Sequence, residues 1–283
     1  MIDDALDACL PPLHSDPPRL NESIRYSVFC GGKRLRPILT LATADALGSD
    51  PRAVLPLGCA IECIHTFSLI HDDLPAIDND DLRRGSPTNH VKFGEAMAIL
   101  AGDALLAMAF ELMAQCRKTL PDSRVLDAIV MVAAASGTYG MVGGQVADIE
   151  AEGSTNVDEN TVASIHARKT GALLMTSIQA SARMCGATPE QERALANYGE
   201  RIGLAFQITD DILDLEGDVD KIGKTVGSDL KQDKATYPKA IGIAASRQLA
   251  GSSAGDAVDA LSIFDQRADP LRALAHYVVE REG

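Results

Sequence analysis

The chain has 283 residues, of which 46% are hydrophobic and 23% charged, a composition typical of a globular protein with a large core. These numbers exclude a disordered, collagen-like or disulfide-stapled chain. Forty acidic residues against 26 basic ones give a net charge of −14, which repels nucleic-acid phosphates, so we expect no nucleic-acid binding. Aromatic residues make up only 4% and Trp is absent, so small and aliphatic residues must fill the core. This favours an all-α fold.

The N-terminal residues, MIDDALDACL, are acidic and lack the basic-then-apolar pattern of a signal peptide. Asp103 and Asp127 interrupt the longest apolar runs before they reach the ~18 residues of a membrane span. We therefore expect a cytoplasmic protein without a membrane anchor.

Apolar and small residues recur at three- and four-residue steps, the period of a helix face, over five long stretches. The predicted helices cover residues 54–72, 96–116, 123–149, 162–185 and 191–214. Turn-forming residues such as Arg84-Gly85-Ser86-Pro87 separate the helices, and no run alternates as a strand does. We predict one helical-bundle domain over residues 1–283.

The first group of chemically suggestive residues is a crowd of aspartates within residues 72–81, followed directly by Arg83 and Arg84. Pro75 interrupts a helix, so Asp72 and Asp73 should stand at a helix end, with Asp78 in the turn beyond. Crowded carboxylates repel one another unless a hard cation binds them. Magnesium takes one or two carboxylates and leaves its other positions to water or phosphate oxygens. A solvated acidic turn is the alternative interpretation.

A second acidic group ends a later predicted helix, where Asp210 and Asp214 lie four residues apart and therefore on one helix face. Like charges at this spacing destabilise a helix unless something binds them. Two acidic groups at the ends of apolar helices suggest helices that face each other across a cavity, with metal held from both walls. Taken alone, the second group could equally be surface.

A third group is Gly31-Gly32-Lys33-Arg34-Leu35-Arg36-Pro37, a glycine-opened cationic run in an otherwise acidic chain. Exposed backbone amides and arginine forks suit phosphate oxygens. Gly223-Lys224-Thr225 gives a similar, weaker signal. Neither run has the spacing of a Walker A loop, and each alone could be a surface loop.

Together these motifs resemble the short-chain trans-prenyltransferases, specifically the bacterial farnesyl diphosphate synthases, from about Tyr26 to the C-terminus. Four residues separate Asp73 from Asp78, as in the first aspartate motif of the bacterial-type enzymes. The motifs that carry the likeness are Gly32-Lys33-Arg34-Leu35-Arg36-Pro37, Asp72 to Gly85, Lys169-Thr170, Gln207 to Asp214, Gly223-Lys224-Thr225 and Lys234-Ala235-Thr236-Tyr237.

The resemblance implies an isoprenoid-synthase-type bundle of antiparallel helices around a central apolar cavity, usually in a homodimer. It implies an enzyme that joins an allylic diphosphate head-to-tail to isopentenyl diphosphate with the help of Mg²⁺. Carried over from the family, the metal ligands are Asp72, Asp78 and Asp210, with Asp73 and Asp214 as supporting or water-mediated ligands.

The same resemblance assigns the remaining polar residues to the two substrates. The groups that neutralise the allylic diphosphate are Arg83, Lys169, Lys224 and Lys234. Those that bind isopentenyl diphosphate are Gly32, Lys33, Arg36, His65 and Arg84. Thr170 and Gln207 point oxygen dipoles at the allylic cation. Without the resemblance, His65 on its apolar helix would be interpreted as a core residue.

Product length is assigned to Phe67 and its neighbour Ser68, because Phe67 lies five residues before Asp72, about 7–8 Å down the same helix. In the resembling family an aromatic residue here accompanies fifteen-carbon products, and smaller residues accompany twenty-carbon products. Farnesyl diphosphate is therefore the expected product. The alternatives are plain core packing for Phe67, a geranylgeranyl diphosphate synthase and, less consistent with the motifs, a terpene cyclase, a non-catalytic partner subunit or a simple metal-binding module.

Overall fold

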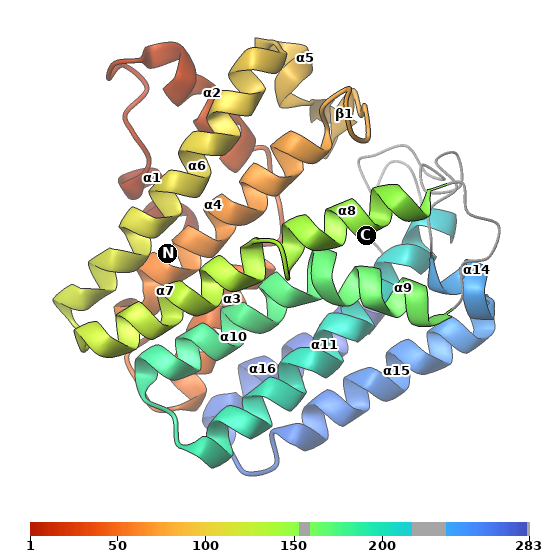
Figure 1. The fold of residues 1–283 in the computed structure, drawn as a ribbon. Helices are drawn as coiled ribbons and strands as arrows, with labels where there is room; N and C mark the ends of the chain where they lie inside the picture. The colour runs from red at the N-terminus through yellow and green to blue at the C-terminus, as the bar shows by residue number, and fades with distance from the viewer. Residues whose placement is uncertain (153–158, 217–235, 282–283) are drawn as a thin grey trace.

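The computed structural model describes residues 1–152, 159–216 and 236–281, and within these ranges the chain is a bundle of helices (Figure 1). The α-helices are α1 (Ile2–Cys9), α2 (Pro18–Val28), α3 (Leu35–Ala46), α4 (Leu55–Asp72), α5 (Asn89–Phe93), α6 (Glu95–Gln115), α7 (Asp122–Ser136), α8 (Met141–Ala151), α9 (Glu159–His166), α10 (Ala172–Cys185), α11 (Pro189–Glu216), α14 (Tyr237–Ile241), α15 (Ile243–Ala260) and α16 (Asp269–Glu280). Short helical turns are η1 (Pro51–Val54), η2 (Cys116–Lys118), η3 (Ala167–Gly171) and η4 (Gln266–Ala268).

The central element is α4, which carries the first acidic motif at its end. Its apolar residues lie all around the helix axis, so it is buried on every side, as such a helix must be. It packs against α6, α3, α1 and α2. This packing holds the end of α4, and with it Asp72, in a fixed place.

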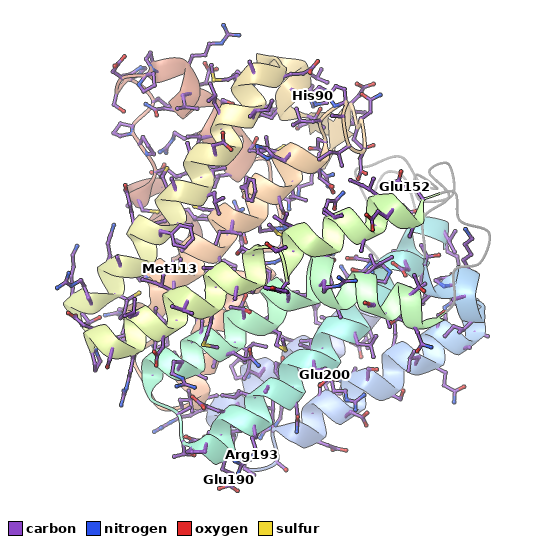
Figure 2. The ribbon with its side chains drawn as sticks, viewed as in Figure 1. His90, Met113, Glu152, Glu190, Arg193 and Glu200 are labelled. Atoms are coloured by element: carbon purple, nitrogen blue, oxygen red, sulfur yellow. The ribbon has the colours of Figure 1, made fainter. Side chains whose placement is uncertain are left out.

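Three hydrophobic clusters stabilise the bundle. The first joins α4, α6 and α7, and Figure 2 shows Met113 of this cluster among its neighbours. The second joins α3, α10, α11, α15 and α16, and the third joins α9, α11 and α14. Charged residues of α11 such as Glu190, Arg193 and Glu200 lie exposed on the outside (Figure 2). The long helix α11 therefore has one face in the core and one in water.

Two of the predicted helices differ in detail from the structure. The predicted helix 123–149 is broken between α7 and α8, where Gly137 and Gly140 lie three residues apart. An added Cβ at Gly140 would meet the carbonyl oxygen of Ala135 at 1.9 Å, so this reversal requires glycine. The predicted helix 162–185 contains η3, a π-helical turn between α9 and α10. Turns of this kind are frequent at functional sites.

The expectation of no strand was wrong at one place. Leu82–Arg83 (β1) and Ser86–Pro87 (β2) form a small antiparallel hairpin beyond α4. Arg84 (φ 54°) and Gly85 (φ 75°) make its turn. Two successive residues with positive φ match the twist of paired strands, and strands this short carry no alternating pattern that a sequence could reveal.

Three helical stretches within the described part of the chain are long and apolar enough, by length and composition, to cross a membrane: Pro51–Asp72, Glu95–Lys118 and Asp122–Ala151. The expectation that single aspartates break every such run was therefore wrong. In the bundle, 67% of the first apolar window is buried, against 39% and 33% of the other two. The absence of a membrane anchor and the cytoplasmic location stay predictions.

Candidate active site

The first acidic motif forms the turn that follows α4. The helix ends at Asp72 as Pro75 predicts, and Asp73 caps it. The backbone N–H of Asp78 donates to the carbonyl oxygen of Asp72 at 2.9 Å, so Asp78 returns to the helix end. The predicted arrangement of these three acids is confirmed.

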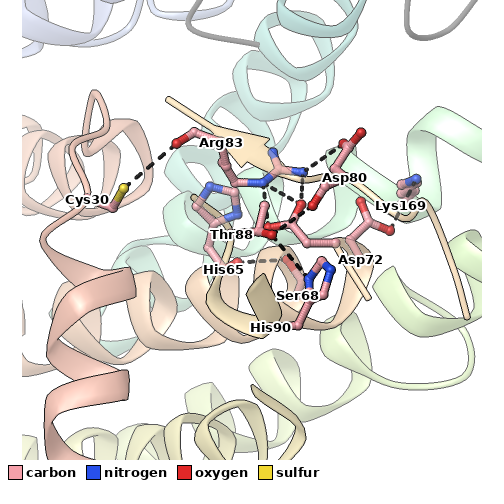
Figure 3. Close-up of polar contacts among 10 residues, drawn as sticks. Cys30, His65, Ser68, Asp72, Asp80, Arg83, Thr88, His90 and Lys169 are labelled. Carbon is pink, nitrogen blue, oxygen red and sulfur yellow. Dashed lines mark hydrogen bonds and ion pairs between the residues drawn. The ribbon is translucent and has the colours of Figure 1, made fainter. Parts of the chain in front are cut away.

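Asp73 is buried and pairs with Arg83 of the hairpin, which Figure 3 shows beside Asp80. The Arg83 Nε donates to the two Asp73 carboxylate oxygens at 2.7 and 3.0 Å, and Asp80 lies 3.8 Å from the same guanidinium. Burial raises the pKa of Asp73 to about 6, although Arg83 acts in the opposite direction. The structure therefore gives Asp73 an arginine partner, and this contact fixes Arg83 beside the acidic turn.

The π-helical turn η3 contains Lys169 and Thr170, and it brings Lys169 to the end of α4. Lys169 Nζ donates to Asp148 Oδ2 at 2.6 Å and lies 3.9 Å from Asp72 Oδ1. Asp148 belongs to α8, where an added Cβ on Gly144 would meet the Lys169 backbone nitrogen at 2.2 Å. This close approach between α8 and η3 places a lysine between two carboxylates.

The second acidic motif lies on α11, where Asp210 and Asp214 differ in their surroundings. The Asp210 side chain is 43% exposed and accepts a hydrogen bond from Arg281 Nη2 at 2.7 Å. Arg281 also lies over the Phe206 ring, 4.2 Å from its centre. Asp214 is 3% exposed. A cation thus faces Asp210.

The glycine-opened loop before α3 approaches Arg84 of the hairpin. Arg84 Nη1 donates to the carbonyl oxygen of Gly31. An added Cβ on Gly32, where φ is 122°, would meet the Arg84 guanidinium at 2.6–2.9 Å. Gly32 is therefore required both for the backbone turn and for the close approach of Arg84.

Two cations of this loop interact electrostatically with Asp210 of the second acidic motif. Arg36 is 8% exposed, and its Nε is buried without a hydrogen-bond partner among the described residues. Burial lowers the pKa of Arg36 to about 10, opposed by Glu62 and Asp210, so the group stays charged at neutral pH. Burial and Arg281 lower the pKa of Lys33, and Asp210 opposes this shift. A buried guanidinium N–H without a hydrogen-bond partner is costly unless an anion binds it.

The third cation of the loop, Arg34, is already paired with carboxylates outside the acidic motifs. Arg34 pairs with buried Glu62 and with Asp3, both at 2.9 Å, and donates to the Val28 carbonyl oxygen. Arg34 therefore has a structural role, unlike Arg36.

Burial and the surrounding arginines push the pKa of His65 well below its ordinary value, so its imidazole is neutral at pH 7.

Phe67 and Ser68 lie on α4 below the acidic turn. The Phe67 ring is 9% exposed and packs edge-on against the ring of His71, with 4.8 Å between ring centres. His71 Nε2 lies 3.0 Å from the Ile99 carbonyl oxygen on α6. Ser68 donates to the His65 carbonyl oxygen at 2.8 Å. The Phe67 ring is thus fixed at the contact between α4 and α6.

Two assigned residues lie outside the part of the chain that the structure describes, and some contact residues were not predicted. Lys224 and Lys234 fall outside the described ranges. Asp148, Asp211 and Arg281, which contact assigned residues, were not predicted from the sequence, and neither was Glu62, which pairs with Arg34 of the cationic loop. A lone acid in an apolar helix signals a buried partner, and this rule could have found Glu62 and Asp148.

The donor set fits magnesium. Within the described ranges no three His, Cys, Asp or Glu side chains gather closely enough to hold an ion by themselves. Carboxylates from α4 and α11 stand instead beside cations, and the buried Arg36 Nε marks a place for an anion. Magnesium commonly takes one or two carboxylates and completes its shell with water and phosphate oxygens, so such separated acids suit a metal that arrives with a diphosphate.

Residues 17–256 match the sequence model of the family described as polyprenyl synthetase. The chain belongs to that family. It is 52% identical over 233 residues to a farnesyl diphosphate synthase of Geobacillus stearothermophilus, covering 82% of this chain and 78% of the relative. It is 45% identical over 283 residues to a geranylgeranyl diphosphate synthase of Cyanophora paradoxa, covering 100% and 94%. The crystal structure of an FPP/GFPP synthase from Zymomonas mobilis superposes with a TM-score of 0.87 at 41% identity, covering 98% and 94%.

Family membership confirms the predicted resemblance and the all-α fold, and makes this polyprenyl synthetase a short-chain prenyltransferase acting on isoprenoid diphosphates. Its relatives include both farnesyl and geranylgeranyl diphosphate synthases, so the relatives do not decide the product length. The product length has to be inferred from the residues of the site.

Proposed function

We propose that this prenyltransferase makes farnesyl diphosphate, by joining first dimethylallyl and then geranyl diphosphate to isopentenyl diphosphate. The observation that carries the proposal is the Phe67 ring, packed between α4 and α6 below Asp72. A tail that grows down α4 from Asp72 meets this ring after about 7–8 Å. A geranylgeranyl product is the second candidate, favoured by the geranylgeranyl names among the relatives.

In this proposal Asp72, Asp78 and Asp210 hold magnesium, with Asp73 and Asp214 in support. When bound, magnesium supplies positive charge to the diphosphate on which negative charge builds as the carbon–oxygen bond breaks. Further neutralising groups are Arg83, Lys169, Lys224 and Lys234. Lys169 Nζ lies 3.9 Å from Asp72 Oδ1, and this position supports its role in neutralising the diphosphate.

The isopentenyl diphosphate binds, in the same proposal, to Gly32, Lys33, Arg36, His65 and Arg84. The unpartnered Nε of Arg36 supports an anion here. Thr170 and Gln207 present neutral oxygens to the allylic cation, which stabilises it without a covalent bond. No described side chain is needed as the final base, because the departing diphosphate can take that proton.

We expect Lys33→Ala and Arg36→Ala to weaken isopentenyl diphosphate binding by about tenfold to more than a hundredfold. The physical reason is the loss of a charge-assisted contact, worth roughly 1.5–3 kcal/mol. Titrating each substrate separately measures the effect, and the allylic substrate is the internal control, with little change expected. An equal loss for both substrates would mean that the two diphosphate sites are wrongly assigned.

We propose further that the enzyme is a homodimer. The side of the bundle formed by α6, α7 and α8 (Figure 1) exposes many large apolar side chains. They are Ile99, Leu100, Leu126, Val130, Tyr139, Val142, Val146 and Ile149. An apolar surface of this kind is typical of an interface, and a second copy of the chain offers the same complementary face.

We expect the double variant Leu126→Glu/Val130→Glu to be monomeric, because it buries two unpaired charges in that interface. Light scattering measures the molar mass, and the wild type should give twice 29.9 kDa. Ile263→Glu is the control, since Ile263 is similarly exposed (48%) but lies outside these three helices, between α15 and α16. A monomeric wild type would overturn the dimer.

A further inference from the structure

Asp211 follows Asp210 directly in the second acidic motif but has different partners. Its side chain is 2% exposed, whereas that of Asp210 is 43% exposed. Asp211 Oδ1 accepts a hydrogen bond from Gln207 Nε2 at 2.8 Å, and Oδ2 accepts one from the Tyr237 backbone N–H at 2.9 Å. His166 Nε2 lies 3.4 Å from Oδ2, and its ring stacks on that of Tyr237. Asp211 is thus engaged with protein groups.

This arrangement fixes which end of the Gln207 amide faces Asp211. Both Asp211 oxygens accept hydrogen bonds, Oδ1 from Gln207 Nε2 and Oδ2 from the Tyr237 backbone N–H, and an amide donates only through its nitrogen. Gln207 must therefore turn its NH₂ group toward Asp211. Its Oε1 lies on the opposite edge of the amide group, where no described residue donates to it.

We propose that Asp211 is a positioning residue that sets the Gln207 amide so that its oxygen, rather than its NH₂ group, meets the allylic cation. The inference rests on the proposed function, because it needs a cation to form beside Gln207. A carbonyl oxygen stabilises positive charge, whereas an NH₂ group presents positive hydrogen atoms and repels it. A preorganised dipole costs no reorganisation when the charge appears.

The test is Asp211→Asn, which keeps the size of the side chain. The substituted amide can still accept from the Tyr237 N–H through its oxygen, but its NH₂ group then faces Gln207. Gln207 satisfies that NH₂ group only by turning its oxygen inward, and this brings its own NH₂ group to the cation. We expect kcat to fall about a hundredfold, as for other reversed or removed catalytic dipoles, with KM for the allylic diphosphate within about twofold of wild type.

The double variant Asp211→Asn/Gln207→Glu separates orientation from structure. The carboxylate that replaces the Gln207 amide has two equivalent oxygens, so one accepts from the substituted amide of Asp211→Asn while the other faces the cation. We expect the kcat of the double variant to exceed that of Asp211→Asn at least tenfold. If Asp211 serves only to hold Tyr237 and the end of α11, the double variant gains nothing over the single one, and the proposal is overturned.

A binding measurement checks the same point without turnover. The probes are an allylic diphosphate analogue with an ammonium group at the cationic carbon and its neutral isostere. Wild type should prefer the ammonium analogue, as enzymes prefer mimics of the transition state, and Asp211→Asn should lose at least tenfold of that preference. An unchanged preference would overturn the proposal.

Two further readouts locate any failure. Binding of Mg²⁺ with inorganic diphosphate, measured by calorimetry, should be the same in wild type and Asp211→Asn, and weaker binding in the variant would show that Asp211 acts on the metal site instead. A wild type that transfers no prenyl group would refute the proposed function. An active wild type with an equally active Asp211→Asn would refute this inference alone.

Discussion

Replacing Asp72 by Asn is expected to lower kcat about a thousandfold while leaving the fold intact. Asp72 ends α4 beside Lys169, and it is one of the carboxylates that we propose hold magnesium at the diphosphate. Charge stabilisation by such a metal is worth several kcal/mol in the transition state, and about 1.4 kcal/mol corresponds to tenfold in rate. Steady-state turnover at saturating magnesium and substrates measures the loss, and thermal unfolding checks the fold.

Asp81→Asn is the matched control, because Asp81 is an exposed acid in the same aspartate-rich turn but outside the assigned metal ligands. It should keep turnover within about threefold of wild type, as a substitution away from the chemistry does. Near-wild-type turnover in Asp72→Asn at saturating magnesium would remove Asp72 from the metal site.

Phe67→Ala is expected to lengthen the product from fifteen carbons to twenty or more. The ring packs against His71 between α4 and α6, and its removal opens space where the growing tail descends. Removing a buried Phe side chain costs about 3–5 kcal/mol of stability, so the assay is run well below the unfolding temperature. Chromatography of the dephosphorylated products gives the chain lengths.

Phe264→Ala controls for the loss of a buried ring. Phe264 is 8% exposed, against 9% for Phe67, but it belongs to the hydrophobic cluster around α3, α11 and α16. It should be destabilised to a similar degree and still stop at fifteen carbons. An active Phe67→Ala with an unchanged product length would show that another residue sets the stop.

Local chemistry made the end of α4 predictable. Pro75 cannot continue a helix, so Asp72 and Asp73 were expected at its end, with Asp78 returning from the turn, and the structure has this arrangement. The cationic loop was recognisable because three cations stood out in an acidic chain. The different roles of the three cations could not be predicted, because Arg34 pairs with Glu62, 28 residues further along the chain.

Long-range pairs account for most of what the sequence did not reveal. Lys169 meets Asp148 through the close approach of α8 and η3, and Arg281 meets Asp210 across 71 residues. The spacing of nearby residues in the sequence does not indicate such contacts, because tertiary packing creates them. Asp211 shows the same limit within one motif: its neighbour in sequence faces solvent, while its own side chain faces the core.

The most direct measurement is to incubate the purified protein with isopentenyl and dimethylallyl diphosphates and magnesium, and to identify the products by chromatography after dephosphorylation. We expect inorganic diphosphate release with farnesol as the main dephosphorylated product. A twenty-carbon main product would contradict the assignment of Phe67, and cyclic hydrocarbons or no condensation at all would contradict the proposed head-to-tail synthase.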